Sequence, residues 1–400
     1  MKHRTLKIAL IFVSLIQLGC ENPTAEMPEK DNWVKIYINC SQTYESIGRD
    51  DTDCDVTLSQ LAQNLLQVSG NIHIRGNSSA LFPKRPFRLK LDRENSIVNM
   101  PPARSWVLLA NYADRSMIRN ALAFRMSEDS QMDWIPHAIF AELYFNNSHK
   151  GTYQLCEKVQ VHPNRLTVPS DGCLVEIDGH VKEGDFYTPH ITVPFHIRWP
   201  EQERLTTETS QRIEQLFVQA DNVLFGDNFA DPEHGWREYM DETSFIEWYL
   251  INEIAKNNDA IFFSSCYMHV NSEGKIVMGP VWDFDLAYGN SVYNDTENPQ
   301  GWHVRTASWY TRLFEDAAFR TAVRKRFDEY YSQREVYIGF IRQMAVVLRA
   351  HVQENEEIWH TMNRQIKYSP AVYSNYDEAV DALITWLNNR FEWMNENLNP

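Results

Sequence analysis

The stretch Phe262-Phe-Ser-Ser-Cys-Tyr-Met-His-Val270, followed by the loop Asn271-Ser-Glu-Gly274 and by Lys275-Ile-Val-Met278, decides the fold of this chain. Two apolar runs joined by a short polar loop that ends in Gly are typical of a β-hairpin. If Val270 faces Lys275, the two arms bring their outer ends together. We therefore predict that residues on either side of this hairpin meet at one mouth.

Acidic residues flank both arms of the hairpin. Asp259 lies just before the first arm, and Asp283 and Asp285 lie just after the second. Crowded carboxylates repel one another unless a cation lies among them or one of them binds a proton. Asp283 and Asp285 are spaced to point to one side of an extended segment and suit Mg²⁺, while Asp259 could accept a proton from an attacking hydroxyl. The alternative is that these residues cap turns or neutralise nearby Arg side chains.

The hydrophobic period changes along the chain. Residues 33–200 contain short runs of alternating apolar and polar residues, which are typical of strands with one buried face. One helix, Arg115–Ser127 with Asp114 at its start, interrupts these strands. From about Leu205 the apolar residues recur at helical spacing. Strands followed by helices predict an α+β chain, with the hairpin inserted in the helical part.

A cationic stretch lies in the strand-rich part. Arg75-Gly-Asn-Ser-Ser79 ends a strand with a small, hydrogen-bonding turn, and Phe82-Pro-Lys-Arg-Pro-Phe-Arg-Leu-Lys-Leu-Asp92 follows it. In this strand the apolar residues face one way, so Arg88 and Lys90 face the other. A Lys above an Asp pair suits phosphoryl transfer, because the cation and a metal neutralise phosphate charge. The alternative is a basic strand face in contact with solvent, which is about as plausible for Arg88 and less so for Lys90.

Composition excludes several classes of protein. With 400 residues, 43% hydrophobic and 23% charged, the chain is neither disordered, nor collagen-like, nor a disulfide miniprotein. A formal net charge of −16 disfavours nucleic acid as a partner. The 12 Trp residues leave a glycoside hydrolase with two carboxylates as a less favoured hypothesis.

The first residues predict export. A basic start is followed by the apolar run Ile8–Leu18, and Leu18-Gly19-Cys20 is similar to a bacterial lipobox. We expect residues 1–20 to be a lipoprotein signal peptide, 21–31 a tether and 32–400 the folded domain. Cys20 would then carry the lipid that anchors the chain to a membrane of the bacterial cell envelope, in the periplasm or at the cell surface. Cleavage near Cys20 without lipid is the alternative.

Export to an oxidising compartment makes the remaining cysteines candidates for disulfides. Cys40 with Cys54, and Cys156 with Cys173, are close enough in sequence to pair, which leaves Cys266 over. We interpret Cys266 as a buried apolar residue rather than a nucleophile.

Four motifs together resemble a known family. They are Arg75-Gly-Asn-Ser-Ser79 with the cationic strand after it, Trp106-Val-Leu-Leu-Ala-Asn111 with Asp114 and Ile118-Arg-Asn120, Gly151-Thr-Tyr-Gln-Leu-Cys-Glu-Lys158, and Met278-Gly-Pro-Val-Trp-Asp-Phe-Asp-Leu-Ala-Tyr-Gly-Asn290. Over approximately residues 70–330 the chain resembles the spore-coat CotH proteins, which are secreted atypical kinases. The resemblance implies a protein-kinase-like fold of two lobes, with a strand-rich lobe at about 32–200 and a helical lobe at about 201–400.

The resemblance also implies roles for the site residues. Asp259 is similar to the catalytic base of a kinase and Asp283 to its metal-binding Asp, and Ser264 stands where a kinase has a metal-binding Asn. Lys90 is the first choice and Lys84 the second for the lysine that contacts phosphate. Arg75 is assigned to cofactor binding on the same basis.

The implied activity is transfer of phosphate from ATP, with Mg²⁺, to Ser or Thr hydroxyls of a protein substrate. An exported chain is removed from the main ATP pool. The alternative is therefore a catalytically inactive envelope lipoprotein that keeps a kinase-like binding cleft.

Overall fold

The computed structural model describes residues 33–61 and 63–399. The expected signal peptide, the tether and Cys20 lie outside the described residues. Within the described part of the chain, no helix has both the length and the apolar character needed to cross a membrane.

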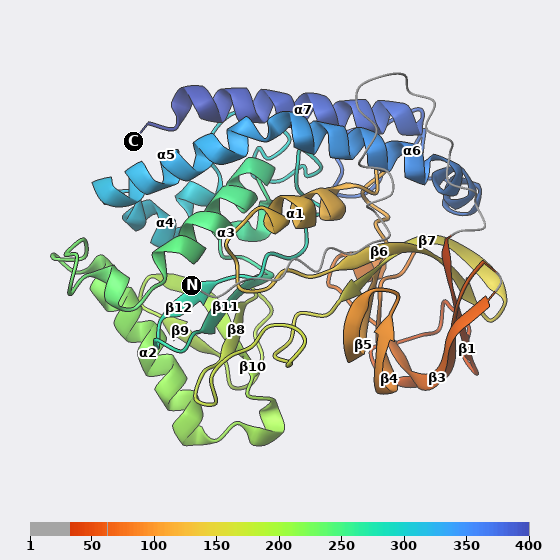
Figure 1. The fold of residues 1–400 in the computed structure, drawn as a ribbon, viewed down its shortest axis with the longest axis horizontal. Coiled ribbons are helices and arrows are strands. Elements are labelled where there is room, and N and C mark those ends of the chain that lie inside the picture. Colours follow the sequence, from red (N-terminus) through yellow and green to blue (C-terminus); the bar gives the residue numbers. More distant parts are fainter. Residues whose placement is uncertain (1–32, 62, 400) are drawn as a thin grey trace.

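The first part of the chain forms a closed β-barrel (Figure 1). Its strands lie in the order β1-β2-β3-β4-β5-β7-β6, and β1 closes the barrel by pairing in parallel with β6. The strands are β1 (Val34–Cys40), β2 (Thr52–Gln60), β3 (Gln63–Ile74), β4 (Phe87–Ile97), β5 (Met100–Leu109), β6 (Ala138–Phe145) and β7 (Ser148–Glu157). Leu89 and its apolar neighbours on β4 are fully buried inside the barrel, so Arg88 and Lys90 lie on the outer face, as the alternation predicts.

A second sheet combines strands from two distant parts of the sequence. Its order is β12-β11-β8-β10-β9, and the strands are β8 (Leu174–Ile177), β9 (Phe186–Thr188), β10 (Ile191–Trp199), β11 (Cys266–Val270) and β12 (Ile276–Met278). β8 pairs with β11 and with β10, and none of these five strands pairs with the barrel. The sequence predicts one strand-rich lobe that holds all strands up to about residue 200. In the structure β8, β9 and β10 belong instead to the sheet that contains the later hairpin. β8 joins this sheet because one edge of β11 in the hairpin is free, and pairing with β8 satisfies the backbone N–H and C=O groups along that edge.

The expected hairpin is present, with its register shifted by one residue. Val270 pairs with Ile276, not with Lys275. The Asn271 side chain accepts hydrogen bonds of 3.0 Å from the backbone N–H groups of Glu273 and Lys275, which makes Lys275 the closing residue of the loop. Gly274 takes a positive φ of +78° at the turn, a conformation that favours Gly.

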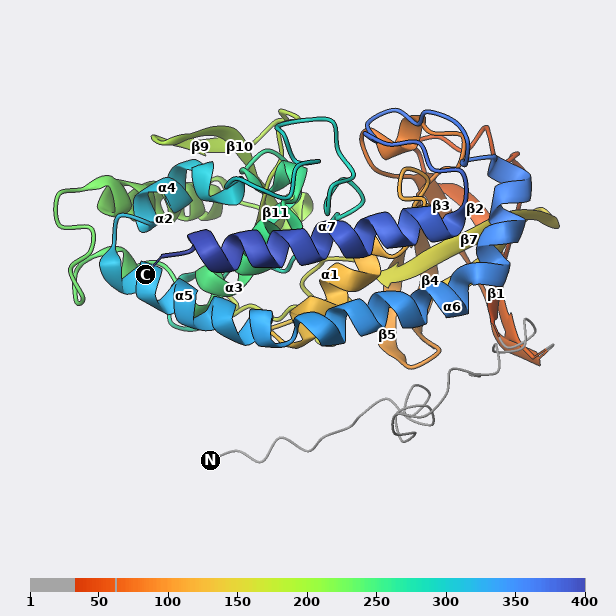
Figure 2. The same cartoon turned by 90° about the horizontal axis from the view of Figure 1, so that it is seen from above.

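Helices cover the second sheet and extend to the barrel. They are α1 (Arg119–Glu128), α2 (Thr207–Phe225), α3 (Glu242–Ala255), α4 (Ser308–Leu313), α5 (Ala317–Ser332), α6 (Arg334–Trp359) and α7 (Tyr376–Asn397). Figure 2 shows α6 and α7 side by side along the length of the molecule, with α6 reaching β7 of the barrel. The α+β class is confirmed, since strand-rich sheets and long helices occur in one chain.

Helix α1 begins later than the sequence predicts. Asp114 does accept hydrogen bonds from the backbone N–H groups of Ser116 and Arg119, at 3.0 and 2.9 Å. Met117 has a φ of +58°, which interrupts helical geometry, so the regular helix begins at Arg119.

Neither of the two disulfides considered is present among the described residues, where five cysteines are free thiols. Cys40 and Cys54 do lie directly opposite each other on β1 and β2. Cys156 and Cys173 belong to different hydrophobic clusters, which does not support their pairing.

Candidate active site

A cavity of about 780 Å³ lies between the barrel and the second sheet. The outer face of β4 lines it on one side, and β8, β10 and the start of β11 line it on the other. Six of the residues expected at a site contribute to its wall: Arg75, Lys90, Asp259, Ser264, Asp283 and Asp285. We call this cavity the cleft.

Asp259 is placed at the cleft by the end of α3. The helix ends at Ala255, Lys256 takes a left-handed conformation, and a short 3₁₀ turn over Asn258–Ala260 carries the carboxylate. The side-chain amide of Asn258 donates a 2.7 Å hydrogen bond to it. Burial, followed by the charge of Asp283, raises the pKa of Asp259 to about 6. Asp259 therefore binds and releases a proton near neutral pH.

Asp283 and Asp285 follow β12 and lie against Asp259. The hydroxyl of Ser265 donates a 3.3 Å hydrogen bond to Asp283, which joins the two ends of the hairpin. Burial, then the charges of Asp283 and Asp259, raises the pKa of Asp285 well above its usual range. The backbone N–H of Leu286 donates to the Asp285 carboxylate and favours its charged form, but burial and the two neighbouring charges outweigh this contact. These carboxylates repel one another and have few donors, which is the environment that a divalent cation stabilises.

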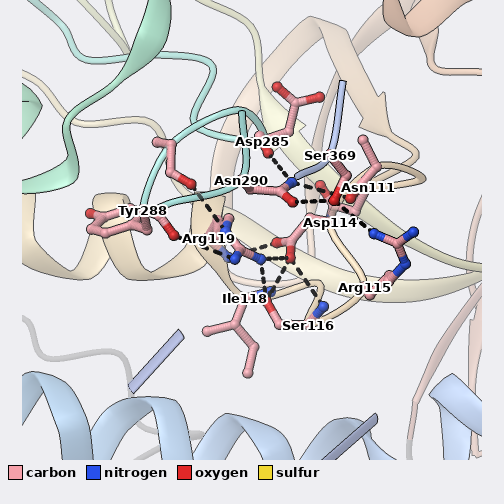
Figure 3. A network of polar contacts seen from close by, with 12 residues as sticks. Asn111, Asp114, Arg115, Ser116, Ile118, Arg119, Asp285, Tyr288, Asn290 and Ser369 are labelled. Atoms are coloured by element: carbon pink, nitrogen blue, oxygen red, sulfur yellow. Dashed lines mark hydrogen bonds and ion pairs between the residues drawn. The ribbon is translucent and has the colours of Figure 1, made fainter. Parts of the chain in front are cut away.

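A buried polar network holds the backbone of this acidic segment (Figure 3). The Asn290 side chain donates to the carbonyl oxygen of Asp285 at 2.7 Å and to that of Ala113 at 3.1 Å. Arg119 pairs with Asp114 and donates to the Ala287 carbonyl at 3.1 Å. The network therefore fixes the segment to the start of α1.

A second contact anchors the same segment from α1. The side-chain oxygen of Asn120 accepts a 2.8 Å hydrogen bond from the backbone N–H of Phe284, the residue between the two Asp residues. Asn120 also donates to Asn111 at 3.2 Å, and Asn111 donates to Gln154 of β7 at 3.4 Å. This chain of amides links the acidic segment to the barrel.

Ser264 lines the cleft, but its hydroxyl has another partner. It donates a 3.2 Å hydrogen bond to Asp178, which directly follows β8. Burial disfavours the charged form of Asp178, but a hydrogen bond from His180 and the charge of Lys182 outweigh burial and lower the pKa. Asp178 is therefore a further carboxylate in the cleft, which Glu94, Glu176 and Glu201 also line, and it is ionised at neutral pH.

The opposite wall of the cleft is cationic. Arg75, Arg88, Lys90, Arg104 and Lys158 line it together with Glu94, while Arg198 of β10 lines the side of the second sheet and pairs with Glu176. Burial, then the charges of Arg88 and Arg198, lowers the pKa of Lys158 to about 7. The Nε atom of Arg88 is buried with no hydrogen-bond partner among the described residues. These cations repel one another, and the Arg88 donor has no partner among the described residues. Such a wall suits a polyanion such as a nucleoside triphosphate.

Lys84, the second choice for the phosphate-contacting lysine, does not line the cleft. Its side chain is fully buried, and Nζ donates to the Thr152 carbonyl at 2.5 Å and to the Asn355 side chain at 2.8 Å. The Pro residues on either side of the Lys84-Arg85 pair leave it in a loop before β4, so strand alternation does not apply to it. The assignment of Lys84 to cofactor binding is wrong for this reason.

Sequence reasoning missed Lys158, Asp178 and the anchoring Asn120. Lys158 directly follows β7, and Asp178 directly follows β8. Polar residues at strand ends are a signal that could have identified both. Asn120 stood in a quoted motif, but nothing local to α1 indicated that it contacts Phe284.

The match to a family model covers the whole of this site. Residues 72–394 match the model described as CotH kinase protein. The chain belongs to the CotH kinase family. The CotH match extends beyond the approximate range 70–330 of the resemblance and includes α6 and α7. No curated protein matches the chain.

Proposed function

We propose that this CotH-family chain is an atypical protein kinase that transfers phosphate from ATP to Ser or Thr hydroxyls of a protein substrate. The observation that carries the proposal is the separation of charge across the cleft. Asp259, Asp283 and Asp285 flank the hairpin of the second sheet, and the barrel side carries Arg75, Arg88, Lys90, Arg104 and Lys158 against one carboxylate, Glu94. Phosphoryl transfer needs a cationic site for the phosphates, carboxylates for the metal and a base for the acceptor.

Asp283 and Asp285 are the residues that would hold Mg²⁺. Their fit rests on the burial of Asp285 beside the carboxylates of Asp283 and Asp259, whose charges help burial to raise the pKa of Asp285. A bound Mg²⁺ neutralises phosphate charge during transfer. Asn120 and Asn290 keep the two carboxylates on one wall by holding the backbone at Phe284 and Asp285.

Asp259 is the residue that would accept the proton of the acceptor hydroxyl. In the reaction the hydroxyl oxygen forms a bond to the γ-phosphorus while the bond to ADP breaks, and the hydroxyl proton passes to the base. A base with a pKa of about 6 is ionised at neutral pH and can also release the proton afterwards. Lys90, Arg75 and Lys158 would bind the phosphates from the opposite wall.

The arrangement in two lobes and the lipid anchor are part of the same proposal. We propose that the barrel and the helical part with the second sheet correspond to the two lobes of a kinase-like fold, with ATP between them. We further propose that the chain is exported and anchored through lipid on Cys20. Mass spectrometry of the membrane fraction, with Cys20→Ser as the comparison, tests the anchor.

The test of the activity is labelled-phosphate transfer from ATP to a generic protein acceptor, with and without Mg²⁺. The proposal predicts Mg²⁺-dependent labelling that is lost in Asp259→Asn and kept in Asp328→Asn, a variant on the surface of α5. The absence of both labelling and nucleotide-induced stabilisation contradicts the proposal.

An inactive binding protein is the second candidate, and one observation favours it. Ser264, at the position of the second metal-binding residue of a kinase, donates its hydroxyl to Asp178. Nucleotide binding without transfer, under all metal conditions, is the result expected of this candidate. A glycoside hydrolase fits less well, because lysine and arginine side chains face the carboxylates across the cleft.

A further inference from the structure

A second group of metal-ligand side chains lies outside the cleft, where α6 packs against β7. Glu142 belongs to β6, His149 to β7 and Glu354 to α6. One ligand atom from each of these side chains lies within 4.8 Å of the other two. None of the three residues lines the cleft.

Glu142 is at the centre of this group. The Glu142 side chain is 4% exposed, and its Oε1 contacts the ring Nδ1 of His351 at 2.7 Å and accepts a 2.9 Å hydrogen bond from the Thr152 hydroxyl. The other oxygen, Oε2, lies 2.5 Å from Nε2 of His149. Oε1 is therefore held by two protein partners, while Oε2 faces His149.

The partners of the buried Glu142 carboxylate are the ring nitrogens of His149 and His351 and the hydroxyl of Thr152. The charge of Glu142 favours the charged form of the nearby Lys84, but burial has the larger effect and lowers the pKa of Lys84 to about 7. Its Nζ donates to Thr152 and Asn355, not to Glu142. The buried carboxylate therefore has no fixed guanidinium or ammonium hydrogen-bonded to it among the described residues.

The local backbone brings α6 close to β7 at this point. Gly151 has a φ of +78°, and a Cβ there would lie 2.5 Å from Oδ1 of Asn355. Gly is thus required for the helix to approach the strand. His149 and Glu354 are only partly buried, which leaves a route by which an ion can enter.

We propose that Glu142, His149 and Glu354 bind a divalent transition-metal ion of the zinc class, which ties α6 to the barrel. One imidazole and two carboxylates are a ligand set that suits zinc, with the remaining position open to water. His351 and Thr152 act as outer partners that orient Glu142, as residues behind a metal ligand usually do. The proposal is independent of the kinase activity.

Zinc titration of the chelator-treated protein tests the site. We expect the Asp283→Asn protein, which lacks one carboxylate of the cleft, to bind one equivalent of Zn²⁺, and we expect a hundredfold excess over Kd to raise its Tm by about 3 °C or more. His149→Ala and Glu354→Gln should abolish this binding, and His351→Ala should weaken it about 10- to 100-fold. Binding should also weaken at acidic pH, because His149 must be unprotonated to bind a metal.

Two controls keep the test specific. His73→Ala removes a partly buried His that pairs with Asp51 at 2.6 Å and belongs to no group of three ligand residues in the described part of the chain, so zinc binding should not change. Asp283→Asn removes one of the acidic residues of the cleft and should also leave the 1:1 site intact. Co²⁺ absorption that changes in His149→Ala but not in Asp283→Asn assigns the metal to this group. No zinc binding, or equal binding by the folded His149→Ala and Glu354→Gln variants, overturns the proposal and leaves a His–Glu pair that shares a proton.

Discussion

Asp283 lies close enough to Asp259 for its charge to help burial raise the pKa of Asp259 to about 6. The two residues stand at opposite ends of the β11–β12 hairpin, and the bond from Ser265 to Asp283 joins these ends. One hairpin thus brings Asp259 and Asp283 together and creates the surroundings that raise the pKa of Asp259 to about 6.

Replacing Asp259 by Asn should separate transfer from binding. We expect phosphate transfer to fall by about 10²- to 10⁴-fold, because the acceptor hydroxyl loses its base. ATP affinity, measured by calorimetry, should stay the same. Retained turnover in this variant would place the base elsewhere.

The free energy of unfolding should decrease as the pH rises towards neutral, because folding raises the pKa of Asp259. Asp259 has a pKa of about 6 in the folded protein and an ordinary, lower pKa when unfolded. Between these values the folded state binds more protons, so the contribution of Asp259 to stability is lost as pH rises through about 6. The Tm of Asp259→Asn minus that of the parent should therefore be larger at pH 7 than at pH 4. A difference that does not change with pH contradicts the assignment.

We expect the same group to set the pH profile of the proposed phosphate transfer. Transfer should fall as pH drops below about 6, because the protonated Asp259 cannot accept the hydroxyl proton. Rates measured at saturating ATP from pH 5 to 8 check this expectation. A rate that stays flat across pH 6 would exclude Asp259 as the titrating base.

Asp283→Asn should abolish nucleotide binding that depends on Mg²⁺ while the fold stays intact. The variant removes one of the two carboxylates expected to hold the metal. Fluorescent-nucleotide titrations with Mg²⁺ and with EDTA measure the effect, and Asp328→Asn is the matched control. Unchanged Mg²⁺-dependent binding would remove Asp283 from the site.

Lys158, which lines the cleft, and the buried Lys84 should respond differently to replacement by Met. Lys158→Met removes a cation from the cleft, so ATP affinity should fall about 10- to 100-fold. Lys84→Met alters the contact between β7 and α6, so ATP affinity of the folded protein should not change. The reverse pattern of affinities would mean that Lys84 reaches the nucleotide.

Cys40 and Cys54 should form a disulfide under oxidising conditions. Opposed residues on antiparallel strands have Cα atoms about 4.5 to 5.5 Å apart, within the range of disulfides. Burial, then the charge of Cys40, raises the pKa of Cys54 to about 12, so the uncatalysed reaction should be slow. Peptide mapping after incubation with a disulfide oxidant should detect Cys40–Cys54 and not Cys156–Cys173. Full alkylation of both Cys40 and Cys54 after that treatment contradicts the expectation.

Local sequence predicted the hairpin and the outward orientation of Lys90. It missed the register by one residue, because the side chain of Asn271 binds the backbone of Glu273 and Lys275 and moves the end of the loop. It also placed the start of α1 too early, because the positive φ of Met117 is not evident from helical spacing.

The sequence by itself determined that Asp259 and Asp283 approach each other and that Arg88 and Lys90 share the outer face of β4. Both follow from short-range rules: a tight loop reverses the chain, and side chains alternate along any strand. Only the tertiary structure decided that Lys158 and Asp178 join the cleft while Lys84 is buried beneath α6. The physical reason is that barrel closure and the pairing of β8 with β11 depend on contacts between distant segments, which no local pattern encodes.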